Sequence, residues 1–112
     1  MRVLEVGEDG HPMSVKYYKG DEEHLLQYYS NMQLRGEGVM KNGLREGRWV
    51  YYHPNGMKQV EAFFVNGKEQ GPYRVYRDNG IPVYVGTYTD GKPSGVWEVY
   101  DNEGQLVQKS EY

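Results

Sequence analysis

The sequence contains no cysteine, so it can form no disulfide, no thiolate nucleophile and no Cys-ligated zinc site. It also lacks any run of about 18 apolar residues, the length that a helix needs to cross a membrane. Its first residues, MRVLEVGEDG, lack the apolar segment of a signal peptide. We therefore expect a cytoplasmic protein.

An excess of charge of one sign is also absent. The 13 Lys and Arg residues are scattered among 16 Asp and Glu residues, for a net charge of -3. Nucleic-acid binding needs a basic stripe that neutralises phosphates, and an anionic membrane surface attracts basic segments. We therefore expect no nucleic-acid partner, and the charge disfavours a membrane surface as partner.

Apolar residues are few. Hydrophobic residues make up 38% of the chain, and 12 Tyr stand against 2 Phe, alongside 15 Gly. The ring of Tyr packs while its hydroxyl stays in contact with water. This composition is typical of a thin structure with many turns.

From Glu23 onward the sequence repeats every 24 residues without a gap. The positions that recur in register are Tyr28, Tyr52, Tyr76 and Tyr100; Trp49, Tyr73 and Trp97; Gly47, Gly71 and Gly95; and Gly56, Gly80 and Gly104. Self-similarity at a fixed period indicates a stacked repeat architecture. We divide the chain, a single domain 1–112, into a degenerate unit 1–22 and the units 23–46, 47–70, 71–94 and 95–112.

Each unit has the pattern of one β-hairpin. In unit 47–70, RWVYYH and MKQVEAFF are strand-like, and the HPNG and VNGK segments are turn signals. The predicted fold is all-β: an elongated single-layer antiparallel sheet (meander) of about five tandem β-hairpin repeats of 24 residues. The predicted strands lie near residues 2–6, 12–18, 24–29, 33–40, 48–53, 57–64, 72–77, 81–88, 96–101 and 105–112.

One position of the return strand is small in every unit: Gly38, Ala62, Gly86 and Ser110. We expect an aromatic ring on one strand to lie flat across the small position of its neighbour, so that the rings tile a stripe along the array. A lone hairpin is marginal in water, and the units are therefore expected to be stable through contacts with their neighbours.

The segments GRWVYYHPNG, GPYRVYRDNG and GVWEVYDNEG carry the pattern G-x-W-x-x-Y…N-G, with Tyr73 in place of the tryptophan in the second segment and Asn-Glu-Gly in place of Asn-Gly in the third. This pattern resembles the MORN repeat, and more closely its bacterial variant, well over residues 23–112 and loosely over 1–22. The resemblance implies an elongated, twisted antiparallel sheet used for binding. Bacterial proteins of the variant type are often antitoxin or immunity proteins of toxin systems, and other MORN proteins are scaffolds or have been linked to phospholipids.

Nothing in the sequence has the pattern of an active site. His11, His24 and His53 lack the spacing of metal ligands, and no serine lies in a nucleophile elbow. The glycines recur at the repeat period, which turns explain, and not at the spacing of a phosphate-binding loop. We expect no catalytic residue, no metal site and no cofactor, and therefore a protein that is not an enzyme.

Candidate partner-binding residues are those at which the units differ on a face that we expect to be exposed: Val50, Arg74 and Glu98. An apolar patch of the kind that marks an interaction site is formed by Ile81, Val83 and Val85. The repeated Tyr52, Tyr76 and Tyr100 lie opposite Trp49 by strand parity. They form either a binding strip or, as their identical recurrence favours, part of the packing of each unit.

The expected function is protein–protein binding, as an immunity or antitoxin-like protein that occludes a toxin partner along one face of the sheet. One alternative is a structural scaffold or self-assembling homo-oligomer, because open sheet edges invite pairing. A third reading is phospholipid-headgroup binding, which the net charge disfavours.

Overall fold

The computed structural model of the protein describes residues 2–6 and 12–112, with side chains from residue 13 onward. These ranges form one antiparallel sheet of eleven strands. The strands are β1 (Arg2–Val6), β2 (Pro12–Lys19), β3 (Glu22–Tyr28), β4 (Leu34–Lys41), β5 (Leu44–Tyr52), β6 (Lys58–Val65), β7 (Lys68–Glu69), β8 (Gly71–Tyr76), β9 (Pro82–Thr89), β10 (Lys92–Tyr100) and β11 (Leu106–Glu111).

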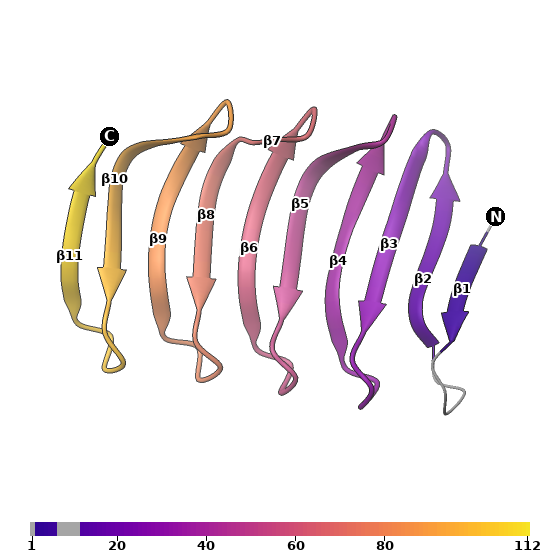
Figure 1. Cartoon of the computed structure of the whole chain (residues 1–112), viewed down its shortest axis with the longest axis horizontal. Helices are drawn as coiled ribbons and strands as arrows, with labels where there is room; N and C mark the ends of the chain where they lie inside the picture. The colour runs from indigo at the N-terminus through magenta and orange to yellow at the C-terminus, as the bar shows by residue number, and fades with distance from the viewer. Residues whose placement is uncertain (1, 7–11) are drawn as a thin grey trace.

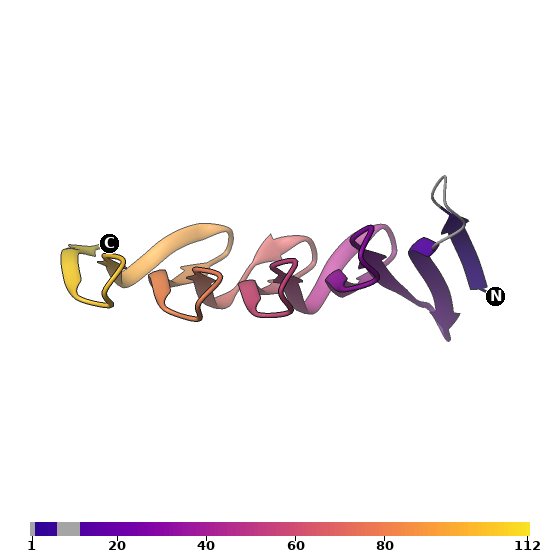
Figure 2. The same ribbon diagram turned by 90° about the horizontal axis from the view of Figure 1, so that it is seen from below.

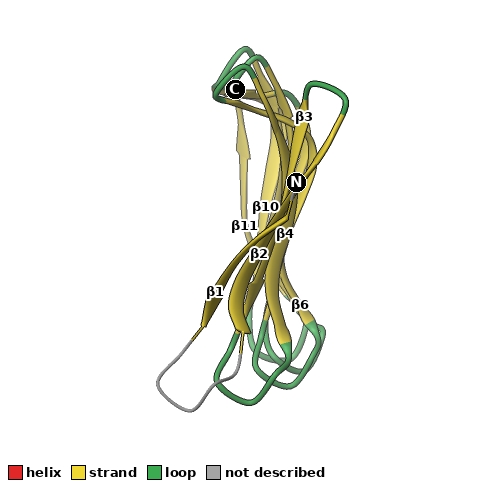
Figure 3. Ribbon diagram, turned by 90° about the vertical axis from the view of Figure 1, so that its right-hand side faces the viewer, coloured by secondary structure: helices red, strands yellow, loops and turns green. Residues whose placement is uncertain are grey.

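The strands lie side by side in chain order, with the two-residue β7 paired to β6 beside β8 (Figure 1). The molecule measures 44 × 31 × 16 Å, and a view along its long axis shows a thin, curved sheet (Figure 3). The predicted elongated, single-layer antiparallel meander is therefore confirmed. Within the described ranges there is no helix with the length and apolar character to cross a membrane.

Two strands begin four residues earlier than the sequence predicts, β5 at Leu44 and not at 48, and β10 at Lys92 and not at 96. The reason is the shortness of the turns that precede them. Asn42 and Gly43 both have positive φ angles, of 53° and 78°, as a two-residue type I′ turn requires. The return strand therefore starts at once, and Gly47 lies inside β5 and not in the connection that we expected.

Gly47 forms part of a wide bulge. Glu46 pairs with Val39 and Val50 pairs with Glu37, so three residues of β5 stand opposite Gly38 alone. Gly47 has a φ of 70°, which glycine adopts without strain. An inserted segment of this kind bends a strand and redirects its side chains.

The bulge places the indole of Trp49 over Gly38, where any Cβ would overlap the ring. The indole Nε1 also donates a hydrogen bond to the Val39 carbonyl at 3.0 Å. Trp97 covers Gly86 in the same way and donates to the Thr87 carbonyl at 3.1 Å. The predicted tiling of rings over small residues is confirmed at these two positions.

The core of this single layer lies on one side, which we call the aromatic face. Its buried residues are Trp49, Ala62 and Phe64, and Leu25, Met40, Tyr51 and Tyr73 pack against them. Further along, Trp97 is surrounded by the rings of Tyr73, Tyr84, Tyr88 and Tyr112 at centroid distances of 5.1–6.4 Å. Burial and ring contacts of this size supply most of the packing free energy of a thin β-structure.

At one end of the strands, the five-residue loops 29–33, 53–57, 77–81 and 101–105 are stacked in a row (Figure 2). Tyr29 donates its hydroxyl hydrogen to the Tyr52 carbonyl at 2.6 Å, and the His53 ring bonds the Tyr76 carbonyl at 2.8 Å. Arg77 continues the series to the Tyr100 carbonyl at 3.2 Å. Each bond joins residues 23 apart, so the side chain after each repeated tyrosine ties one hairpin to the next.

Candidate functional site

Cross-strand pairing defines a second surface, opposite the aromatic face. Residues that pair directly across two strands point to the same side of a sheet. The pairs link one residue of each strand into a continuous line, which we call the central row: Leu26, Glu37, Val50, Glu61, Arg74, Val85, Glu98 and Lys109. Because Val50 and Glu61 alternate along their strands with Trp49 and Ala62, this row lies on the other side of the layer, which we call the polar face.

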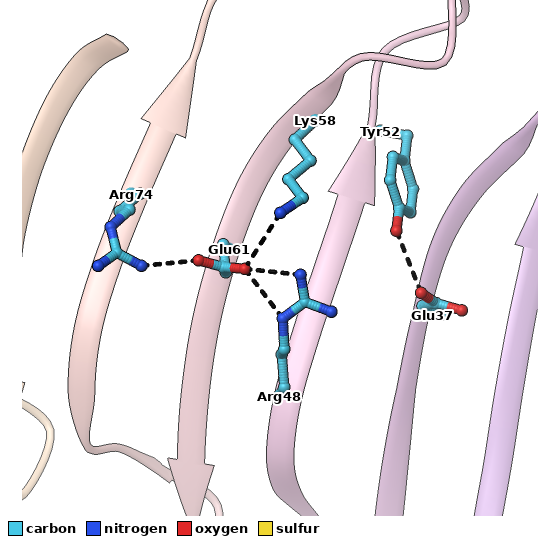
Figure 4. A network of polar contacts seen from close by, with 6 residues as sticks. All are labelled: Glu37, Arg48, Tyr52, Lys58, Glu61 and Arg74. Atoms are coloured by element: carbon cyan, nitrogen blue, oxygen red, sulfur yellow. Dashed lines mark hydrogen bonds and ion pairs between the residues drawn. The ribbon is translucent and has the colours of Figure 1, made fainter. Parts of the chain in front are cut away.

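At the centre of the polar face lies a buried carboxylate shared by three cations (Figure 4). Glu61 is 8% exposed. Arg48 donates to its Oε2 from Nε at 2.9 Å and from Nη2 at 2.7 Å, and Arg74 Nη1 donates to Oε1 at 2.7 Å. Lys58 Nζ lies 3.5 Å from Oε2. The cluster therefore holds the side chains of three strands in fixed positions.

Opposing effects act on the pKa of Glu61. Burial alone would raise the pKa of this carboxyl, but the hydrogen bonds from Arg48 and Arg74 and the charge of Lys58 outweigh burial and lower it. The carboxylate therefore stays ionised well into the acid range. The cations remain partly open to solvent, with 38–46% of each side chain exposed.

A second bridge crosses from β5 to β4. The Tyr52 hydroxyl donates to Glu37 Oε1 at 3.1 Å. Burial and the neighbouring Glu37 carboxylate raise the pKa of Tyr52, so its hydroxyl remains a donor. This contact gives the repeated tyrosine of this unit a structural role on the polar face.

One predicted binding residue on this face is not exposed. Val50 is 1% exposed, so the prediction that it stands on an exposed face is wrong. Arg48 and Tyr52, its neighbours along β5, reach to opposite sides, toward Glu61 and Glu37. The small side chain of Val50 is enclosed between these longer ones and supports them from below.

Arg74, Val85 and Glu98 lie where sequence parity placed them, as consecutive members of the central row. The apolar patch of Ile81, Val83 and Val85 is half-buried and not an open surface. Ile81 belongs to the turn before β9, where its amide bonds Asn79 Oδ1. Whether these residues bind a partner stays a prediction.

Tyr52, Tyr76 and Tyr100 each lie directly after a register shift near the end of a strand. Their carbonyls accept the inter-hairpin hydrogen bonds described above. These contacts explain why a strand-end residue recurs at this position. A direct contact of the three rings with a partner remains a prediction.

Sequence reasoning missed the cluster of Arg48, Lys58 and Arg74 around Glu61, and the separate bridge from Tyr52 to Glu37. The signal of the cluster was available in the spacing, since Arg48 to Glu61 and Glu61 to Arg74 are both 13 residues. An alternation of charge at that interval indicates cross-strand pairs once the turns of a hairpin are known. The bulge at Gly47, which sets the register of β5 against β4, could not be placed from the repeat alone.

The described ranges gather no group of three or more potential metal ligands. The His24 ring bonds Glu22 Oε2 at 3.1 Å, and the His53 ring bonds the Tyr76 carbonyl. His11 lies outside the described residues. The geometry of the polar face is instead that of a surface with fixed, mixed charge.

Comparison with known proteins finds a match to two parts of the chain. A family model described as MORN repeat variant matches residues 45–66 and 93–112. These ranges cover most of β5 with β6 and of β10 with β11, the two hairpins that contain Trp49 and Trp97. Among curated proteins none matches the chain.

Proposed function

Taking the chain as a MORN repeat protein, we propose that it is a protein-binding module that acts through its polar face and catalyses no reaction. The observation that carries this proposal is the Glu61 cluster, in which Arg48 and Arg74 are held by short hydrogen bonds yet stay partly exposed. Side chains fixed in advance lose little conformational freedom when a partner binds.

The two faces divide the work of folding and binding. The aromatic face buries the residues on which the packing of the sheet depends. The polar face presents Glu37, Arg74, Glu98 and Lys109 in a row that crosses most of the sheet. A broad surface with fixed charges of both signs is typical of the polar part of a protein interface.

A protein partner fits these charges better than a lipid surface does. MORN repeats serve as binding modules for proteins or membrane lipids. An anionic membrane attracts clusters of basic residues, whereas Arg74 lies between acidic members of the central row, Glu61 on one side and Glu98 beyond Val85 on the other. Protein binding is therefore the function that we propose.

In its finer form the proposal names the partner as a toxin and the chain as its immunity protein. The support is the likeness of the repeats to the bacterial MORN variant. The mechanism is steric: a sheet measuring 44 × 31 Å covers the partner's functional surface without chemical change. Toxin neutralisation requires tight binding only, which a preorganised face favours.

The test begins with capture of partners by the tagged chain from its native source, followed by calorimetry on purified components. Glu98→Lys reverses one charge of the central row and is expected to weaken binding about tenfold or more. Glu103→Lys is the matched control, since Glu103 lies in an exposed turn outside the row. Equal affinities for the two variants would refute binding through the polar face.

The finer proposal has its own readout. If the captured partner stops growth when expressed alone, and co-expression of the chain restores growth, the immunity role is supported. A partner that does not stop growth would be compatible with protein binding but would contradict the proposal that the partner is a toxin. Concentration-dependent self-association with no captured partner would favour a scaffold, built through the outer strands β1 and β11.

A further inference from the structure

A small hollow opens on the polar face beside the Glu61 cluster, across strands β2 to β5. Its volume is about 150 Å³. The side chains that line it on this face include Tyr17, His24, Leu26, Glu37, Arg48 and Val50. Small-molecule sites measure roughly 300–1,000 Å³, so this hollow accommodates the end of one side chain and not a drug-sized ligand.

The hollow lies between the side chains of His24 and Arg48, which point away from each other. The His24 ring stacks on Tyr17, with centroids 4.7 Å apart and planes at 12°. Arg48 turns to the opposite side, where it binds Glu61. Leu26 and Val50 line the space between them and give it an apolar wall, and the stacked rings form another wall.

Glu37 supplies the charge of the hollow. Its Oε1 accepts the Tyr52 hydroxyl hydrogen, which holds the carboxylate in one orientation. Within the described part of the chain Glu37 forms no ion pair, because the nearby Arg48 is engaged by Glu61. The carboxylate can therefore accept further donors along the rest of its edge.

We propose that the hollow receives an arginine side chain of the protein partner, an inference that rests on the proposed function. The guanidinium would donate to the Glu37 carboxylate, and such charge-assisted bonds are the stronger kind. The methylenes of arginine would pack on Leu26 and Val50, and its planar cation would face the ring wall. A lysine offers a point charge without the planar fork.

The experiment uses the intact chain and a single-residue probe, Nα-acetyl-arginine amide, titrated at pH 8 and low ionic strength and followed by amide chemical shifts. We expect weak, saturable binding with shifts concentrated at Tyr17, His24, Glu37 and Val50. Nα-acetyl-citrulline amide has nearly the same shape without the charge and is expected not to bind. Nα-acetyl-lysine amide is expected to bind more weakly than the arginine probe.

Glu37→Gln tests the counter-ion, because its amide oxygen can still accept the Tyr52 hydroxyl hydrogen. We expect it to weaken arginine binding at least about tenfold. Glu103→Gln, in an exposed turn outside the central row, is expected to leave binding unchanged. Tyr17→Leu removes the outer ring of the wall and is expected to weaken binding by a smaller factor.

Three results would overturn the inference: citrulline or lysine binding as well as arginine, equal effects of the two Gln variants, or shifts spread over the whole surface. The probe needs no partner, so its outcome is independent of the proposed function. If a protein complex forms through the polar face but the hollow does not bind the arginine probe, the inference of an arginine site fails and the proposed function stands. If the hollow binds arginine but no protein partner is captured, the proposed function fails, and with it the assignment of the arginine to a partner, while the hollow remains an arginine site.

Discussion

The two faces of this sheet, a single layer thick, are built on opposite principles. On the aromatic face, large rings cover residues without side chains, and Trp49 over Gly38 leaves no room for even one methyl group. On the polar face, long charged side chains arch over small apolar ones, as Arg48 does beside the buried Val50. A thin sheet can therefore bury side chains on both sides, by packing of rings on the aromatic face and by ion pairing on the polar face.

The largest expected effect is on the aromatic face. Gly38→Ala places a Cβ inside the Trp49 indole, so we expect a loss of about 3 kcal/mol in the free energy of unfolding, from overpacking. Gly43→Ala is the control: its φ is 78°, but nothing lies within 4 Å of the added Cβ. That variant should lose only about 1 kcal/mol. Urea titration of both proteins measures the difference, and equal losses would contradict the tiling.

The corresponding change on the polar face is Glu61→Ala. It leaves Arg48 and Arg74 without their shared carboxylate, and we expect a loss of about 2 kcal/mol. Glu98→Ala removes a carboxylate that forms no ion pair in the described ranges and should change stability little. Thermal melts at neutral pH make the comparison. A loss of stability in Glu98→Ala as large as that in Glu61→Ala would mean that the ion pairs of the Glu61 cluster add no stability of their own.

Alkali is expected to destabilise the aromatic face. Burial, with a further contribution from Tyr84 and Tyr88, raises the pKa of Tyr73 to about 12 from its usual 10.0. A raised pKa in the folded state means that this stabilisation is complete below pH 10 and is lost as the pH rises toward 12. Denaturation between pH 8 and 12 should therefore show a falling limb that Tyr73→Phe makes shallower. An unchanged limb would contradict the prediction.

Acid acts on the polar face with the opposite sign. The pKa of Glu61 lies below its ordinary value of 4.5, because the arginine hydrogen bonds overcome the effect of burial. The stabilisation is therefore present above pH 4.5 and is lost as the pH falls through the lowered pKa. Glu61→Gln should flatten the acid limb of the stability profile while the alkaline limb stays as in the wild type. A parallel change in both limbs would argue against separate roles for the two faces.

The smallest expected effect lies at the loop of the second unit. Met32 occupies the position that Gly56 and Gly80 hold in later units, and it has a φ of 72°. A non-glycine residue in this region is strained. Met32→Gly should raise stability by about 0.5 kcal/mol, less than the strain itself because glycine also gains freedom in the unfolded chain. Calorimetric melting is sensitive enough to detect the gain, and a lower melting temperature would show that the methionine side chain contributes packing.

Much of the fold could be predicted because short segments of the sequence specify it. The 24-residue register and the Asn-Gly turns place the hairpins, and the small residues at Gly38 and Gly86 identify the aromatic stripe. The early start of β5 and the bulge at Gly47 were missed because several arrangements of a glycine fit the same period. The strand itself is specified by the sequence, whereas its irregularity depends on how the Trp49 ring packs.

The candidate site was only partly predictable for the same reason. Arg74, Val85 and Glu98 follow from strand parity, which alternates regardless of register. The burial of Val50 and the contact of Tyr52 with Glu37 depend on which residues of β4 and β5 stand opposite one another, and the bulge shifts that alignment by two residues. A hollow such as the one beside Glu37 depends in addition on the side-chain orientations of His24 and Arg48, which no sequence period contains.

The pairing of each strand with its neighbours in the chain also has a kinetic consequence. Neighbouring strands of the described sheet are consecutive in the chain, except that β6 also pairs with β8 across the two-residue β7. Proteins whose contacts are close in sequence fold fast, because only short loops have to close. An all-β chain with this connectivity should therefore fold at a rate closer to that of a helical bundle than to that of a β-sandwich. Folding can begin at any interior hairpin and spread outward one hairpin at a time.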